Sequence, residues 1–243
     1  EHVYQQEHKL DIHSIPFGHS PSFGNLGEAV RKRFGFYGPD FSFNTACTSS
    51  ANALWYASRL IQAGKIRYAL VLGVEVINHI TAFGFHGLGL LTRSVMKPFD
   101  AGRDGLVLGE AASALLLGPG SAQDFRLLGG ANLCDTHSMS AANADGSSVA
   151  AVISAALSEA NLPHTAIAAI KAHGTASLLN DEAEAAGLLR IFLDSDLPPV
   201  CALKPFIGHT LGACGLTELI LFWQAITNGF IPATAGIGAD STV

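Results

Sequence analysis

Cys47 is the residue of this sequence with the clearest potential for nucleophilic chemistry. It lies in the stretch FNTACTSSANALWYA, where Thr48, Ser49 and Ser50 are residue types that favour the first turn of a helix. A thiol at a helix N-terminus faces free backbone N–H groups and the positive end of the helix dipole, which both stabilise the thiolate. Position alone leaves two alternatives open: a reactive cysteine, more acidic than a free thiol, or a buried structural cysteine.

Two of the ten histidines lie in settings that favour a chemical role. His173 stands in KAHGTASLLND, directly after an apolar run that predicts a strand, and His209 stands in LKPFIGHTLGACG, between a short predicted strand and a long predicted helix. Cys47 also follows a predicted strand. In open α/β sheets ligands bind at the carboxyl ends of strands, so we expect the three side chains to meet at one sheet edge. Hydrogen-bonded packing at that edge is the alternative for the histidines.

The elements that must position these residues alternate along the chain. A glycine-rich loop or broken helix is expected over 79–92. Helices are predicted over 23–34, 48–63, 145–161, 181–192 and 212–229, and strands over 41–46, 67–76, 109–118, 125–133, 166–174 and 200–204. Alternating strands and helices predict an α/β fold with largely parallel sheets. The stretch GPGSAQD, residues 118–124, is the best internal boundary because glycine, proline and small polar residues cluster there.

Composition excludes several classes of protein. The 243 residues are 49% hydrophobic and 14% charged, and their net charge of −6 argues against a nucleic-acid surface. No run of 18 apolar residues predicts a membrane span, and the N-terminal stretch lacks the apolar core of a signal peptide. The four cysteines form no CxxC pair and no cluster that predicts a zinc site. Reduced thiols in a cytoplasmic protein are therefore expected.

Four motifs together resemble the β-ketoacyl-acyl carrier protein synthases, condensing enzymes of the thiolase-like superfamily. They are TACTSS around Cys47, KPFDAGRDGLVLGEAA at 97–112, AHGTASLLNDEAE at 172–184 and LKPFIGHTLGACGLTE at 203–218. The resemblance implies a layered αβαβα architecture of two similar halves with mixed, largely parallel sheets. Residues 1–118 would belong to the N-terminal half with the nucleophile, and residues 124–243 to the C-terminal half with both histidine motifs.

The resemblance also implies roles for the residues that match it. Cys47 would accept the acyl chain, and His173 and His209 would form the pair at which a malonyl group loses carbon dioxide. Lys204 and Glu218 would form a supporting ion pair, although an ordinary ion pair is the alternative. Supporting roles are expected for the acidic pair Asp181 and Glu184, and Asp181 could also cap the helix over 181–192.

Two surface regions have expected roles in substrate handling. The loop after the central strand would line an acyl channel, with Phe83, Phe85 and His86 as its bulky residues; a plain glycine-rich connection is the alternative. Arg93 and Lys97 would attract an acidic carrier protein, because a chain of net charge −6 needs a local basic patch to do so. An ordinary solvated pair of charges is the alternative there.

Substrates would arrive on the phosphopantetheine of acyl carrier protein, and no further cofactor and no metal are expected. The expected partners are this carrier protein and a second ketosynthase-like chain, in a homodimer or heterodimer. A non-catalytic chain-length subunit is the alternative function, although such subunits usually lack the cysteine. Thiolases and coenzyme A-primed synthases are disfavoured by the two-histidine pattern. Compared with the family, the chain is expected to be shortened at both ends, and Lys171 replaces a more usual Asn or Glu.

Overall fold

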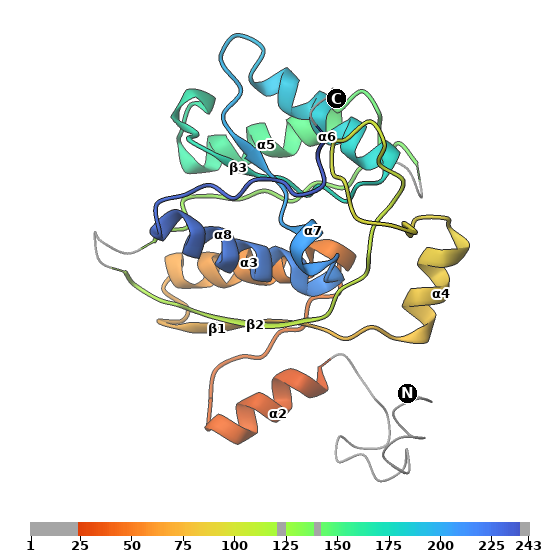
Figure 1. The fold of residues 1–243 in the computed structure, drawn as a ribbon. Coiled ribbons are helices and arrows are strands. Elements are labelled where there is room, and N and C mark those ends of the chain that lie inside the picture. Colours follow the sequence, from red (N-terminus) through yellow and green to blue (C-terminus); the bar gives the residue numbers. More distant parts are fainter. Residues whose placement is uncertain (1–23, 121–124, 139–141, 239–243) are drawn as a thin grey trace.

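The computed structural model describes residues 24–120, 125–138 and 142–238, and their elements stack in five layers (Figure 1). From one side to the other these are α2, the β1–β2 sheet, α3 with α8, the β3–β4 sheet, and α5 with α6. Their bounds are α2 (Asn25–Phe34), β1 (Ala69–Glu75), β2 (Ala111–Leu117), α3 (Ser49–Gln62), α8 (Cys214–Thr227), β3 (Ile170–Lys171), β4 (Val200–Cys201), α5 (Ser147–Ala160) and α6 (Leu178–Ile191). The predicted αβαβα layering is therefore confirmed.

The two described sheets differ in strand direction. β1 pairs antiparallel with β2, in a register that joins Ala69 to Leu117 and Glu75 to Ala111. β3 pairs parallel with β4, with Ile170 opposite Val200 and Lys171 opposite Cys201. The predicted α/β class with mixed sheets is confirmed, and the longer of the two pairings is the antiparallel one.

The central helices α3 and α8 bring two distant chain segments together. Leu54 and Ala57 of α3 form a core cluster with Val71 of β1 and Leu216 of α8. The helices approach closely at Gly215, where an added Cβ would lie 2.8 Å from the Cβ of Ala51. Because the two helices begin near this contact, the turns that precede them face the same edge of the layer.

Several predicted strands are shorter than expected or are not formed. The segments 41–46 and 125–133 form no strand, and those predicted over 166–174 and 200–204 keep only two paired residues each. A strand is defined by the ladder it shares with a neighbour, and within the described part of the chain these segments have little or no ladder partner. The apolar pattern predicts an extended backbone, but it does not show whether a neighbouring strand pairs with it.

Shorter elements complete the fold. The region predicted as a loop or broken helix contains α4 (His79–Gly87), which Asn78 caps by accepting a hydrogen bond from the Thr81 amide at 2.9 Å. Three 3₁₀ turns, η2 (Ala46–Thr48), η3 (His164–Ala166) and η4 (Leu211–Ala213), and the short helix α7 (Lys204–Ile207) follow along the chain. Residues 121–124 of the predicted boundary lie outside the described residues, so the division into two halves stays a prediction. Among the described helices, none is both long and apolar enough to cross a membrane.

Candidate active site

Cys47 lies in the 3₁₀ turn η2, two residues before α3 begins. Ala46 before it adopts a left-handed φ of 52°, a conformation that costs a non-glycine residue about 1–2 kcal/mol. Ser49 holds the turn, since its hydroxyl accepts from the Thr45 amide at 2.9 Å and donates to the Ala46 carbonyl at 2.7 Å. Cys214 donates its thiol hydrogen to the Cys47 carbonyl at 3.1 Å. These contacts fix where the Cys47 side chain points.

His209 is held by its backbone against the strand-like segment before β2. Its amide donates to Val107 at 2.7 Å and its carbonyl accepts from Gly109 at 3.0 Å. Gly109 permits this approach, because a Cβ there would collide with the carbonyl oxygen of Ile207. The imidazole is 1% exposed, and its Nε2 lies 3.0 Å from the Sγ of Cys47. The predicted meeting of the nucleophile and the second histidine is therefore present.

His173 follows β3 and faces His209 edge to face, with ring centroids 5.2 Å apart and planes at 85°. Lys204 Nζ lies 3.2 Å from His173 Nδ1 and donates to the His173 carbonyl at 2.6 Å. An ammonium group can only donate, so Nδ1 accepts and the proton of the neutral imidazole sits on Nε2. Lys204 thereby fixes the tautomer that has an N–H donor on the side away from the lysine.

Behind the histidines lies a buried cluster of opposite charges. Lys204 and Glu218 are both completely buried, and their charged atoms lie 2.7 Å apart. The second oxygen of Glu218 accepts from Lys171 Nζ, also at 2.7 Å. The predicted Lys204–Glu218 pair is present, and a second lysine joins it.

The acidic pair after the first histidine supports loops of the site. Glu184 accepts from the amides of His173 at 2.6 Å and Gly174 at 2.8 Å, which orients the turn that carries the imidazole. Asp181 accepts from the amide of Phe99 at 2.9 Å, where the backbone has a positive φ of 63°. Asp181 lies inside α6, whose N-cap position is Ser177, so its possible role as helix cap is not observed.

Burial controls the proton affinities of the site. Desolvation lowers the pKa of His209 to about 4 and, together with the Lys204 charge, holds the pKa of His173 well below its usual range. Desolvation also raises the pKa of the Cys47 thiol above its ordinary value, although Lys204 opposes this. The expectation of an unusually acidic Cys47 is therefore wrong for the resting site. Burial removes water that would stabilise the thiolate, and this effect on the pKa is larger than the opposite effect of the helix terminus and Lys204.

Cys47, His173 and His209 are better suited to react with and hydrogen-bond a substrate than to bind a metal ion. One group of described side chains could hold a metal ion, and it is this same trio, whose ligand atoms lie within 4.8 Å of one another. The ammonium of Lys204, 3.2 Å from His173, would repel a cation there. Neutral imidazoles with N–H donors instead suit an oxygen atom that becomes negative during a reaction.

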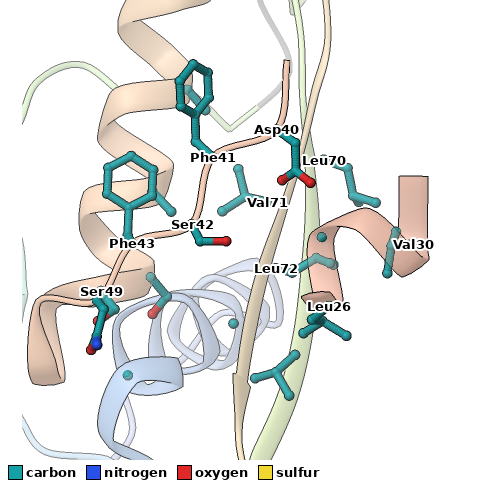
Figure 2. Close-up of a pocket in the computed structure, with 18 of the residues that line it drawn as sticks. Leu26, Val30, Asp40, Phe41, Ser42, Phe43, Ser49, Leu70, Val71 and Leu72 are labelled. Atoms are coloured by element: carbon teal, nitrogen blue, oxygen red, sulfur yellow. The ribbon is translucent and has the colours of Figure 1, made fainter. Parts of the chain in front are cut away.

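A cleft of about 1400 Å³ opens beside Cys47. Its walls come from α2, β1, the segment 36–44 and the start of α4. Figure 2 shows Leu26 and Val30 of α2 facing Leu70 and Leu72 of β1, with the segment around Phe41 beside them. The cleft is mostly apolar near these residues, as is typical of sites that bind small molecules.

The predicted channel residues occupy different places. Phe85 lines the cleft and packs against the core cluster of Met96, Leu106 and Ala176. Phe83 and His86 lie outside the cleft lining; Phe83 is 70% exposed and stacks on His79 instead. The structure thus brings only one of the three predicted residues to the cleft wall.

The predicted docking residues lie after α4. Arg93 is exposed and Lys97 is half-buried. Another basic residue, Arg59 of α3, instead forms an ion pair of 2.7 Å with Glu159.

Two residues near the site make contacts that the sequence analysis does not predict. Lys171 was noted as unusual, but its contact with Glu218 spans 47 positions and has no local signal. Glu75 ends β1, and its carboxylate accepts from the Gly212 amide at 3.0 Å, beside the turn before α8. A charged residue within an otherwise apolar strand was the available signal for Glu75.

Two family models match consecutive parts of the chain. The beta-ketoacyl synthase N-terminal domain matches residues 5–122, and the beta-ketoacyl synthase C-terminal domain matches residues 126–238. A chloroplast 3-oxoacyl-[acyl-carrier-protein] synthase I from Arabidopsis thaliana is 31% identical over 231 residues, 89% of this chain and 49% of the relative. The 3-oxoacyl-[acyl-carrier-protein] synthase 2 of Vibrio harveyi is 30% identical over 84% of this chain and 53% of its own length. The chain thus spans about half the length of these curated relatives.

Solved structures agree with this assignment. A ketosynthase in complex with its chain length factor from Xenorhabdus doucetiae matches with a TM-score of 0.84 and 30% identity, over 100% of this chain and 60% of that one. A beta-ketoacyl synthase from Burkholderia phymatum matches with a TM-score of 0.82 and 27% identity, over 99% and 61%. The layered fold and the site define a thiolase-like protein. More specifically, the chain belongs to the beta-ketoacyl synthase family.

Proposed function

We propose that this chain carries the acylation and condensation site of a β-ketoacyl-acyl carrier protein synthase. The observation that supports this most directly is the convergence of Cys47, His173 and His209, whose reactive atoms lie within 4.8 Å of one another beside an apolar cleft. The Cys47 thiol gives its proton to Nε2 of His209 as sulfur attacks the carbonyl of an acyl thioester. The chain remains on Sγ as a new thioester, and the carrier thiol leaves with the proton.

Condensation then uses both imidazoles as donors. The carbonyl oxygen of a malonyl thioester accepts from Nε2–H of His173 and of His209, and loss of carbon dioxide leaves an enolate on that oxygen. The enolate carbon attacks the acyl carbonyl on Cys47, and the C–S bond breaks to release a product two carbons longer. During acylation the neutral His209 ring carries its proton on Nδ1, so that Nε2 can accept from the thiol; for condensation this proton moves to Nε2. The Nδ1 of His209 has no hydrogen-bond partner among the described residues, so no protein acceptor there opposes this change of tautomer.

Substrates in this proposal are carried by the phosphopantetheine of acyl carrier protein, in fatty acid or polyketide biosynthesis, and no other cofactor takes part. We place the protein in the cytoplasm, with a second ketosynthase-like chain as partner. The exposed aromatic residues Phe36, Tyr37 and Phe41 support such a partner, because an extended apolar segment of this kind is stabilised when another chain covers it. The mass and composition of the purified assembly would show whether that chain is identical or related.

The alternative is a non-catalytic chain-length subunit, since one solved relative is a ketosynthase in complex with its chain length factor. Incubation with acyl-acyl carrier protein, followed by mass spectrometry, separates the two functions. The proposed enzyme gains one acyl group on Cys47, and Cys47→Ala gains none. A folded chain that binds the carrier protein without acylation would instead support the chain-length subunit.

A further inference from the structure

Glu218 is clamped between two lysines that belong to different elements. Its Oε1 accepts from Lys204 of α7 and its Oε2 from Lys171 of β3, both at 2.7 Å. Glu218 is 0% exposed, and a buried carboxylate requires partners for its oxygens. Because each oxygen has its own ammonium partner, the carboxylate cannot turn away from Lys204.

Lys171 also changes the balance of charge behind His173. Lys204 touches the His173 ring and carbonyl, and Glu184 accepts from the His173 amide. Lys204, Glu184 and Glu218 together would leave one excess negative charge, which favours a protonated imidazole. The ammonium of Lys171 cancels that excess. Its side chain is 22% exposed, so it reaches the buried cluster from the partly solvated side.

Six titratable groups surround His173. Lys204 on α7 and the His209 and Cys47 side chains lie beside its ring, Glu184 on α6 binds its backbone amide, and Lys171 on β3 and Glu218 on α8 lie behind Lys204. Burial is the largest cause that lowers the pKa of His173, and the charges of Lys204 and Lys171 act in the same direction. Both lysines therefore favour the neutral imidazole.

We propose that Lys171 is a positioning residue for the histidine pair: it holds Oε2 of Glu218 and supplies a second ammonium behind His173. Lys204 is thereby kept on Nδ1, and the Nε2–H of His173 stays directed at the substrate oxygen. This inference deepens the proposed function and rests on it for its catalytic meaning.

The first test measures the protonation of His173 directly and needs no activity. Histidine side chains are labelled with ¹⁵N, and the His173 signal is identified by its loss in His173→Asn. We expect Lys171→Met to raise the titration midpoint of His173 by about one pH unit, and Lys171→Arg to restore the parent value. Lys65→Met, which removes an exposed lysine after α3, is the matched control and should leave the midpoint unchanged. An unchanged midpoint in Lys171→Met overturns the inference.

The second test follows malonyl-carrier protein decarboxylation across pH. Lys171→Met should lower kcat about tenfold with KM unchanged, and move the acid limb of the profile to higher pH, because His173 is protonated more easily. A loss of stability with an unmoved acid limb shows a structural role only and overturns the inference. If Lys171→Met does not fold, Lys171→Gln, which keeps a donor without the charge, replaces it in both tests. Should the parent lack decarboxylation, the proposed function fails while the titration still decides the role of Lys171.

Discussion

The Sγ atom of Cys47 lies 3.0 Å from Nε2 of His209, although 162 positions separate the two residues in the sequence. Burial raises the pKa of the thiol and lowers the pKa of the imidazole, so the resting pair is a neutral thiol beside a neutral histidine. In the proposed reaction, the thiol therefore passes its proton to His209 only as the sulfur attacks the thioester. A neutral resting nucleophile is also protected from oxidation, which acts on thiolates.

The thiol of Cys47 should be less acidic than a free thiol. We expect its labelling by iodoacetamide to rise with pH with a midpoint above about 8.5, the ordinary value for cysteine. Peptide mass spectrometry follows Cys47 separately from Cys134, which is exposed and serves as the reference thiol. A midpoint below that of Cys134 would contradict the burial argument and restore the helix-terminus argument.

Acid should destabilise the fold through His209. Its folded pKa of about 4 lies below the ordinary value of 6.5, so the unfolded chain binds the proton more tightly. The free energy of unfolding should therefore fall as pH drops below 6.5 and level off near 4, with a loss of about 3 kcal/mol from this group. Urea unfolding at a series of pH values measures the loss.

His209→Gln is the control for this prediction. It removes the titrating ring and should flatten the part of the pH dependence that His209 contributes, while the contribution of His173 remains. An equal pH dependence in the parent and in His209→Gln would show that other groups cause the acid instability.

Removing one member of the buried ion pair should be costly. Lys204→Met leaves Glu218 with Lys171 as its remaining cation, and we expect the free energy of unfolding to fall by about 3–5 kcal/mol. The double variant with Glu218→Leu should lose less than the sum of the single variants, because it leaves neither a half-paired buried carboxylate nor the buried Lys204 ammonium without its carboxylate. Urea unfolding of the four chains closes this cycle, and additive losses would show that the pair is not coupled.

The sequence predicted the convergence of the site better than its energetics. The meeting of Cys47, His173 and His209 was predicted from strand ends, but only His173 closely follows a paired strand; Cys47 follows an unpaired segment and His209 follows α7. The acidity of Cys47 was predicted with the wrong sign, because burial depends on packing from distant segments. The contact of Lys171 with Glu218 was not predicted for the same reason, because the two residues lie 47 positions apart. The strand expected over 41–46 was wrong because pairing depends on a neighbour that local pattern does not reveal.

Phe85 should influence the length of the acyl chain, whereas Phe83 should not. Phe85 lines the cleft beside Cys47, whereas Phe83 is not a lining residue and stacks on His79, which is. Phe85→Ala enlarges the cleft wall, so products of the condensation should shift to longer chains. Phe83→Ala is the matched control on the same helix. Mass spectrometry of carrier-bound products compares the two, and equal distributions would show that α4 only connects its neighbours.

Arg93 and Lys97 should help bind the acidic carrier protein. They lie close together after α4, and the net charge of −6 means that attraction must come from such a local patch. Charge reversal at both positions should raise KM for acyl-carrier protein about tenfold and weaken its dependence on salt. A free acyl thioester without the carrier should react as before. Arg59→Glu is the matched control, because Arg59 is already paired with Glu159 and should leave KM unchanged. If both substrates respond equally to the reversal at Arg93 and Lys97, these residues serve the fold or the chemistry rather than docking.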